Sequence, residues 1–146
     1  MTELEDKRMD VKQVIVVRRD LNMRKGKMCA QVAHASSAWL RDGVIFKDME
    51  DAEGYPQQPH KHELQVPLTD LEVHYLEGNY RKVVVWVRTE KELLDLALKA
   101  AHLENVHLQY DNGATEFHGE RTLTCLAIGP EMSPNVDIVT GHLPLL

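Results

Sequence analysis

Two short runs made only of apolar residues predict strands that are covered on both faces of a sheet. They are Val14–Val17 (VIVV) and Val83–Val87 (VVVWV). A strand buried on both faces shows no polar alternation, so a continuous apolar run is typical of it. Two further apolar segments, Val106–Tyr110 and Leu123–Ile128, predict a third and a fourth strand.

Apolar residues at helical spacing, with start and stop signals around them, predict helices between and after these strands. The first runs from about Lys25 to Arg41 and ends near Gly43, and a short one covers 68–76 and ends at Gly78. A third follows the segment 89–92, and a last short helix starts at the Ser-Pro pair of 133–134 and ends at Gly141. Residues 69–72 and 89–92 both place Thr three residues before Glu, the spacing of a capping box.

This order of elements is typical of an α/β domain with at least one right-handed crossover. The sheet should be mixed, because the stretch between Tyr110 and Leu123 is too short to hold a helix comfortably. Ligands of such sheets usually bind beyond the carboxyl ends of the strands. The segments 19–27 and 111–115 and the region after Val87 are therefore expected to lie together.

Two segments carry no clear periodicity. Residues 1–11 are charged and are interpreted as a disordered or loosely attached tail. Residues 42–67 contain three prolines, two histidines and an acidic cluster, and they are interpreted as a long surface excursion. Long loops in compact domains are often functional, so a lid is one role for this excursion.

Composition narrows the class of protein. The chain has 146 residues, 43% of them hydrophobic and 27% charged, as expected for one soluble globular domain. No apolar run reaches the ~20 residues of a membrane helix, and the charged N-terminus does not resemble a secretory signal. Cys29 and Cys125 are too few for a disulfide framework, so we expect buried thiols in a reducing cytoplasm.

Charge is unevenly distributed. The net charge of −6 argues against broad electrostatic capture of nucleic acid. Five basic residues nevertheless fall within ten positions: Arg18, Arg19, Arg24, Lys25 and Lys27. Such a local basic site suits one or a few phosphates better than a long duplex.

The start of the first helix is the first candidate site. Arg24, Lys25, Gly26 and Lys27 place basic groups and free backbone N–H groups where the helix dipole favours an anion. Met28 follows Lys27 and no glycine stands at the required position upstream, so this is not the phosphate loop of nucleotide hydrolases. A plain solvated basic turn is the alternative.

Polar side chains on the same helix and after the third strand form the second candidate. Lys27, Gln31 and His34 share one helix face, and His34 either orients its neighbours or acts in proton transfer. The run Asp111-Asn112-Gly113-Ala114-Thr115 predicts an Asx-type turn that presents a carboxylate and a hydroxyl. If Asp111 lies near Lys27, the pair could orient a water and stabilise an oxyanion, although an ordinary turn is the alternative.

The remaining histidines and the tryptophans carry little signal. His60, His62 and Glu63 form a single His-x-His loop that no cysteine joins, so we expect no metal. Trp39 and Trp86 lie in apolar stripes and are expected in the core.

Three segments in order resemble the type II, archaeal and eukaryotic, peptidyl-tRNA hydrolase family. They are VIVVRRDLNMRKGKMCAQVAHA at 14–35, DNGATE at 111–116 and LAIGPEMSPNVDIVTGHLPLL at 126–146. The resemblance covers roughly 12–41 and 79–146, whereas 42–78 does not visibly match. It therefore indicates a domain at 12–146 with a divergent excursion at about 42–78.

The resemblance implies a fold and an activity. The fold is a single three-layer α/β domain, a four-stranded mixed β-sheet with helices on both faces. The activity is hydrolysis of the ester that joins a peptide to the 3′ end of tRNA, in the cytoplasm, by a homodimer that needs no cofactor. By motif position, Lys27, Asp111 and Thr115 correspond to proposed catalytic residues, and Gln31 and His34 to the surrounding site. As a hypothesis, Gln31 fixes Lys27 from one turn along the helix.

The sequence also departs from the family pattern. Ala114 replaces an arginine, Glu116 a neutral glutamine, Arg24 a glycine and Pro144 a lysine. These changes bear on RNA affinity more than on chemistry. Two alternatives therefore stay open: a non-catalytic tRNA- or nucleotide-binding module of the same fold, and a hydrolase of a smaller ester or amide.

Overall fold

The computed structural model describes residues 9–146 and contains a four-stranded mixed sheet in the order β4-β1-β6-β5. Its strands are β1 (Val11–Arg18), β4 (Lys82–Val87), β5 (Val106–Asp111) and β6 (Thr122–Met132). β1 pairs in parallel with β4 and antiparallel with β6, and β5 pairs antiparallel with β6. The mixed sheet is therefore confirmed.

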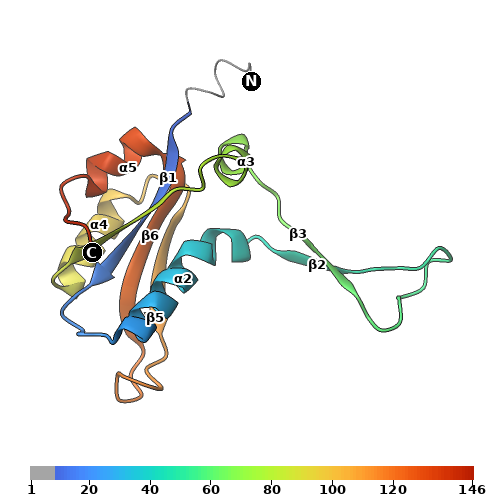
Figure 1. Cartoon of the computed structure of the whole chain (residues 1–146), viewed down its shortest axis with the longest axis horizontal. Coiled ribbons are helices and arrows are strands. Elements are labelled where there is room, and N and C mark those ends of the chain that lie inside the picture. The colour runs from blue at the N-terminus through green and yellow to red at the C-terminus, as the bar shows by residue number, and fades with distance from the viewer. Residues whose placement is uncertain (1–8) are drawn as a thin grey trace.

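Helices cover both faces of this sheet (Figure 1). α2 (Lys25–Arg41) and α3 (Asp70–Glu77) lie on one face, and α4 (Glu90–Lys99) and α5 (Ser133–Thr140) on the other. The three-layer α/β architecture follows from this arrangement. Thr69 and Glu72 form the predicted capping box of α3, and Thr89 caps α4.

The continuous apolar run of β1 packs in two directions. Val14 and Val16 join the core under α4 and α5, whereas Ile15 and Val17 pack on the α2 side. All four are at most 1% exposed. This double burial is the reason that the strand carries no polar alternation.

The two edges of the sheet differ. Along β4, the C-terminal segment runs beside the strand, and the Trp86 N–H donates to the Pro144 carbonyl while the Leu146 N–H donates to that of Val84. β5 forms the opposite edge, and within residues 9–146 no strand pairs with its outer side. The free edge of β5 borders the candidate site.

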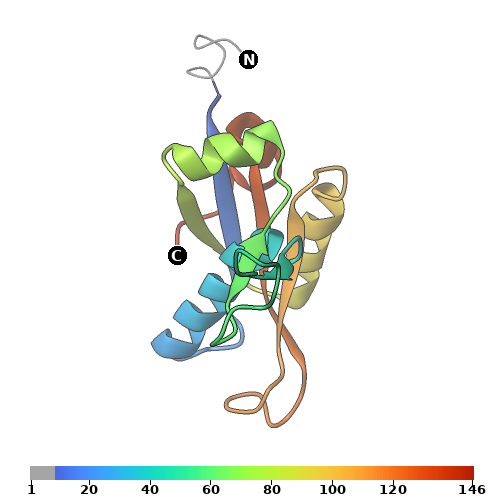
Figure 2. The same ribbon diagram turned by 90° about the vertical axis from the view of Figure 1, so that its right-hand side faces the viewer.

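The excursion contains a two-stranded hairpin that the sequence interpretation missed. β2 (Ile45–Asp48) pairs antiparallel with β3 (His62–Gln65), and every residue of both strands is exposed. The hairpin extends from the end of α2 away from the sheet (Figures 1 and 2). The surface position was predicted correctly, but in this arrangement the hairpin does not cover the carboxyl ends of the strands.

Several smaller expectations need correction. Cys125 is buried as predicted, but Cys29 is exposed. Trp39 lies in the core, whereas Trp86 is only half-buried beneath the guanidinium of Arg19, 4.5 Å from the ring centroid. Of the predicted tail, residues 1–8 lie outside the described part, and Met9 packs against the Trp39 cluster.

Within residues 9–146, no helix is both long and apolar enough to cross a membrane.

Candidate active site

The three segments expected at the carboxyl edge of the sheet do lie together. Arg18 of β1 stands level with Val87 of β4, and Val17 is aligned through Cys125 of β6 with Gln109 of β5. The turn before α2, the segment after β4 and the turn after β5 therefore share one end of the sheet.

Lys27 and Asp111 face each other at this end. The Nζ of Lys27, in the first turn of α2, lies 3.0 Å from Oδ1 of Asp111, at the end of β5. The two side chains are 14% and 9% exposed, respectively, so water reaches the pair only partly. The proximity of Lys27 to Asp111, on which the second candidate site depended, is therefore present.

Asp111 is held by two further hydrogen bonds. The amide Nε2 of Gln31 donates to Oδ1 at 3.1 Å, and the Gly113 N–H donates to Oδ2 at 2.8 Å. The second bond closes the predicted Asx-type turn. Each carboxylate oxygen accepts about two hydrogen bonds, so contacts from described residues fill Oδ1 and leave one position on Oδ2.

Glycine is required at position 113. Its φ is +82°, in the left-handed region, and a Cβ there would collide with the backbone carbonyl oxygen of Glu120. The turn that presents its N–H to Asp111 therefore depends on the absence of a side chain.

The pKa of Asp111 is lowered. Burial by itself raises the pKa of the carboxyl, but the hydrogen bonds from Lys27 and Gly113 and the charges of Lys27 and His34 together outweigh it. Asp111 is therefore a stable carboxylate near neutral pH and a weak proton acceptor.

Sequence analysis missed Thr124, which stands behind this pair. Thr124 is wholly buried, and its Oγ1 lies 2.7 Å from Oε1 of Gln31 and 3.1 Å from the Gln109 carbonyl. The hydroxyl fixes which end of the Gln31 amide faces Asp111. Gln31 therefore positions Asp111, whereas its predicted contact with Lys27 is absent from the hydrogen bonds between described residues. The available signal was a lone hydroxyl within an apolar strand.

The other predicted site residues are placed less tightly. Lys25 and Gly26 begin α2 and are exposed, and His34 lies on the exposed part of the helix face that carries Gln31. Thr115 lies exposed in the 112–121 loop, and its side chain makes no hydrogen bond to the residues that the structure describes. The structure therefore brings Lys27, Gln31 and Asp111 together but does not join Thr115 to them.

A carboxylate of the chain itself occupies part of the helix start. Oε2 of Glu116 accepts from the Arg24 N–H at 3.4 Å, and its Oε1 lies 3.8 Å from Nε of Arg24. Arg18 is not available to a ligand either, because it is buried, ion-paired with Asp20 and hydrogen-bonded to the Leu123 carbonyl. Fewer basic side chains are therefore available to bind an anionic ligand than the sequence suggested.

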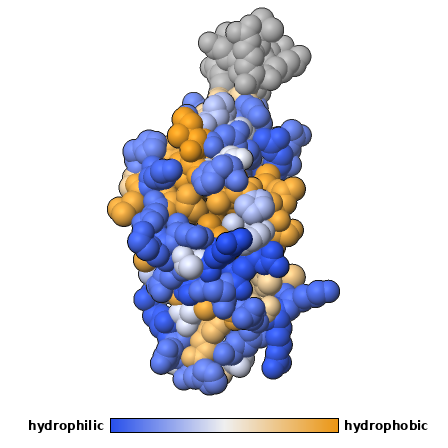
Figure 3. All heavy atoms as spheres, turned by 90° about the vertical axis from the view of Figure 1, so that its left-hand side faces the viewer, coloured by the Kyte–Doolittle hydropathy of each residue, from blue (hydrophilic) through white to orange (hydrophobic). Residues whose placement is uncertain are grey.

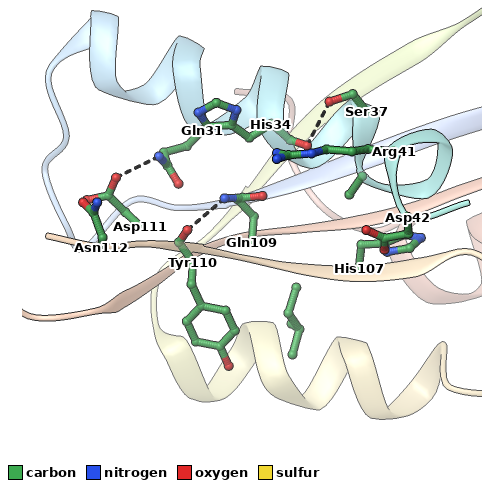
Figure 4. A pocket seen from close by; sticks show the side chains of 12 residues that line it. Gln31, His34, Ser37, Arg41, Asp42, His107, Gln109, Tyr110, Asp111 and Asn112 are labelled. Atoms are coloured by element: carbon green, nitrogen blue, oxygen red, sulfur yellow. Dashed lines mark hydrogen bonds and ion pairs between the residues drawn. The ribbon is translucent and has the colours of Figure 1, made fainter. Parts of the chain in front are cut away.

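A groove of about 460 Å³ runs from Asp111 between α2 and β5 (Figure 4). Its near end holds Gln31 and Asn112, and its far end holds Arg41, Asp42 and His107. No group of three or more potential metal ligands forms within residues 9–146. His62 pairs with Asp48, at 2.8 Å on the exposed hairpin.

Comparison with known proteins identifies the family of this chain. The family model described as "Peptidyl-tRNA hydrolase PTH2" matches residues 11–146. The chain belongs to the PTH2 peptidyl-tRNA hydrolase family. The match includes residues 42–78, which the resemblance noted from the motifs did not cover.

Curated relatives extend over nearly the full length of both chains. A protein named peptidyl-tRNA hydrolase from Methanopyrus kandleri is 39% identical over 92% of this chain and 97% of its own. Those of the same name from Methanothermobacter thermautotrophicus and Methanocaldococcus jannaschii are each 38% identical over 93% of this chain and 100% of their own.

Proposed function

We propose that this chain hydrolyses the ester bond between the peptide and the tRNA of peptidyl-tRNA, releasing free tRNA. The name of the PTH2 family supports the substrate. The observation that carries the proposal is the Lys27–Asp111 pair, which two further hydrogen bonds fix at the carboxyl edge of the sheet.

Asp111 orients the attacking water in this proposal. The free position on Oδ2 accepts a hydrogen bond from that water and directs an oxygen lone pair at the ester carbon. The water oxygen bonds to that carbon, the bond from the carbon to the ribose 3′ oxygen breaks, and the proton that the water loses passes through solvent to the 3′ oxygen. Because its pKa is lowered, Asp111 contributes by charge and placement more than by basicity.

Lys27 stabilises the negative charge that develops on the ester oxygen. Its ammonium group has three N–H donors, and the ion pair with Asp111 uses one of them. A fixed cation beside a developing oxyanion is a large source of rate enhancement in a partly dry site. An activated ester needs little more than such positioning, so no covalent intermediate and no cofactor is part of the proposal.

The other residues at family motif positions have supporting roles in this proposal. Thr115 would have to approach the site with its loop, because it is exposed and joined to neither Lys27 nor Asp111. We assign it a hydrogen bond to the intermediate or the water once substrate is bound. Arg24, Lys25 and the helix start would hold a phosphate of the tRNA 3′ end, in competition with Glu116.

Release of N-acetyl-amino acid from N-acetyl-aminoacyl-tRNA tests the activity. We expect turnover by the wild type and a loss of at least ~100-fold in Lys27→Ala and in Asp111→Asn, equivalent to about 2.7 kcal/mol. Lys47 and Asp48 are exposed on β2 of the hairpin, so Lys47→Ala and Asp48→Asn are matched controls that should keep full activity.

Two other outcomes correspond to the alternatives. Absence of turnover while tRNA still binds would turn the proposal toward a non-catalytic binding module. Turnover of small esters without salt-dependent tRNA binding would indicate a hydrolase of a smaller substrate.

We also propose that the chain acts as a cytoplasmic homodimer that associates through its α4–α5 face. Exposed apolar side chains gather on this face (Figure 3). Leu98 is 76% exposed, Ile138 78% and Leu145 72%. Soluble monomers rarely expose large apolar patches. Sedimentation analysis should give a dimer for the wild type and a monomer for Leu98→Glu with Ile138→Glu, and a monomeric wild type would contradict this assembly.

A further inference from the structure

The groove beside Asp111 is bounded by two rows of polar side chains. His107, Gln109 and Asp111 alternate along β5, so they lie on the face of the strand that looks toward α2. His34, Ser37 and Arg41 follow one another along the facing side of the helix. Figure 4 shows Gln31 and Arg41 reaching from the helix into the space above the strand, whereas the Ser37 hydroxyl turns back to the His34 carbonyl at 3.3 Å.

The position of the ester decides which half of the substrate lies in this groove. Peptidyl-tRNA continues in two directions from its ester carbon, as RNA and as peptide. The exposed basic residues Arg24 and Lys25 lie at the N-terminal end of α2, on one side of the Lys27–Asp111 pair. The groove leaves the same pair in the opposite direction, toward the C-terminal end of α2.

We propose that this groove binds the peptide half of the substrate as an extended chain that is recognised through its backbone. The inference rests on the proposed function, because it takes the Lys27–Asp111 pair as the place where the ester is held. Gln31 and Asp42 are eleven positions apart, which corresponds to roughly 16 Å at ~1.5 Å per helical residue. An extended peptide advances ~3.3 Å per residue, so the groove accommodates about five residues.

The groups that line the groove match a peptide backbone. β5 is an edge strand, and the N–H and C=O groups of alternate residues point to its unpaired side, where an extended chain can add. A chain that pairs with the Tyr110 carbonyl displaces the Gln109 amide, which donates to that carbonyl at 2.8 Å. At the far end, Nδ1 of His107 lies 3.1 Å from the Asp42 carboxylate, which can only accept. Nε2 of the same ring is buried and has no hydrogen-bond partner among residues 9–146.

Recognition of this kind is independent of peptide sequence. The groove offers hydrogen-bonding groups along its length and no deep apolar pocket among its lining residues. Such a surface accepts chains of any sequence and gains affinity with each residue that it pairs, up to the length of the groove.

Peptide length is the variable to test. We would compare hydrolysis of N-acetyl-aminoacyl-tRNA with that of an N-acetyl-pentapeptidyl-tRNA that has the same tRNA and the same C-terminal amino acid. Two or three additional net hydrogen bonds predict a kcat/KM at least ~10-fold higher for the longer substrate in the wild type.

A bulky substitution that blocks the groove gives a second test of the inference. Ser37→Trp places a large ring at an exposed helix position that lines the groove, and Ala33→Trp places the same ring at an exposed position of α2 that does not line it. We expect the ratio between the long and the short substrate to fall toward one in Ser37→Trp and to stay at the wild-type value in Ala33→Trp.

Failure of this inference is distinguishable from failure of the proposed function. A wild type that hydrolyses neither substrate contradicts the proposed function. A wild type that hydrolyses both equally well, or a Ser37→Trp variant that keeps the length preference, contradicts the peptide groove alone. Equal losses on both substrates together with weaker binding of uncharged tRNA would show that RNA lies in the groove, which also contradicts the inference.

Discussion

Replacement of Thr124 by valine would isolate the contribution of the buried hydroxyl behind the site. Valine has nearly the same shape as threonine, so the wholly buried position stays filled and only the hydroxyl is lost. That hydroxyl lies 2.7 Å from Oε1 of Gln31, whose Nε2 in turn lies 3.1 Å from the Asp111 carboxylate. The substitution therefore removes the group that fixes the amide of Gln31.

The size of the effect follows from burial. Gln31 is 3% exposed, so its Oε1 has little access to water once the hydroxyl is gone. Leaving a buried acceptor unpaired costs about 1–3 kcal/mol, and we expect the free energy of unfolding to fall by that amount. An amide free to rotate also spends part of its time with its oxygen toward Asp111, which weakens the placement of the carboxylate. We expect kcat/KM to fall about tenfold, equivalent to ~1.4 kcal/mol.

Two measurements check this reasoning. Urea denaturation gives the change in stability, and hydrolysis of N-acetyl-aminoacyl-tRNA gives the change in kcat/KM. Thr140 is 3% exposed, and its hydroxyl donates to the Val136 carbonyl at 3.2 Å on α5, on the opposite face of the sheet, so Thr140→Val is the control and should keep its activity. A Thr124→Val protein that is less stable but fully active would refute the view that the hydroxyl positions Gln31 for catalysis.

Three further changes test neighbouring groups. Glu116→Gln removes a carboxylate from the helix start and should strengthen tRNA binding several-fold at low salt, as measured by a binding titration; unchanged affinity would contradict the competition. Gly113→Ala places a Cβ against the Glu120 carbonyl at a φ of +82° and should lower both the melting temperature and turnover. Lys27→Met removes a hydrogen bond and a charge that lower the pKa of Asp111, so the acid limb of its residual activity should move to higher pH; a limb that stays in place would exclude Asp111 as the titrating group.

Sequence patterns predicted the elements whose residues are buried or capped. Continuous apolar runs predicted β1 and β4, and a Thr–Glu capping box that is present in the structure predicted α3. The hairpin of β2 and β3 gave no such signal because both strands are exposed along their whole length. With no buried face, a strand has no reason to alternate apolar and polar residues.

The candidate site was predictable only in part, for a related reason. Lys27 lies at the start of the first helix and Asp111 at the end of the third predicted strand. Both belong to polar motifs that are visible in the sequence. Thr124 lies inside the apolar strand LTCLAI, and a threonine there is equally compatible with simple β-strand packing. Its role depends on the register of β6 against β5, which local sequence does not specify.

The lowered pKa of Asp111 limits what kind of hydrolase this site can be. A carboxylate held by Lys27, Gln31 and Gly113 is ionised over the whole physiological range and gains little by taking a proton. The same contacts fix its geometry, so rate enhancement has to come from alignment of the water and from the charge of Lys27. That balance suits an ester, whose leaving group departs without strong acid assistance, and it suits an amide poorly. The contacts around Asp111 therefore favour the ester of peptidyl-tRNA over the peptide bonds beside it.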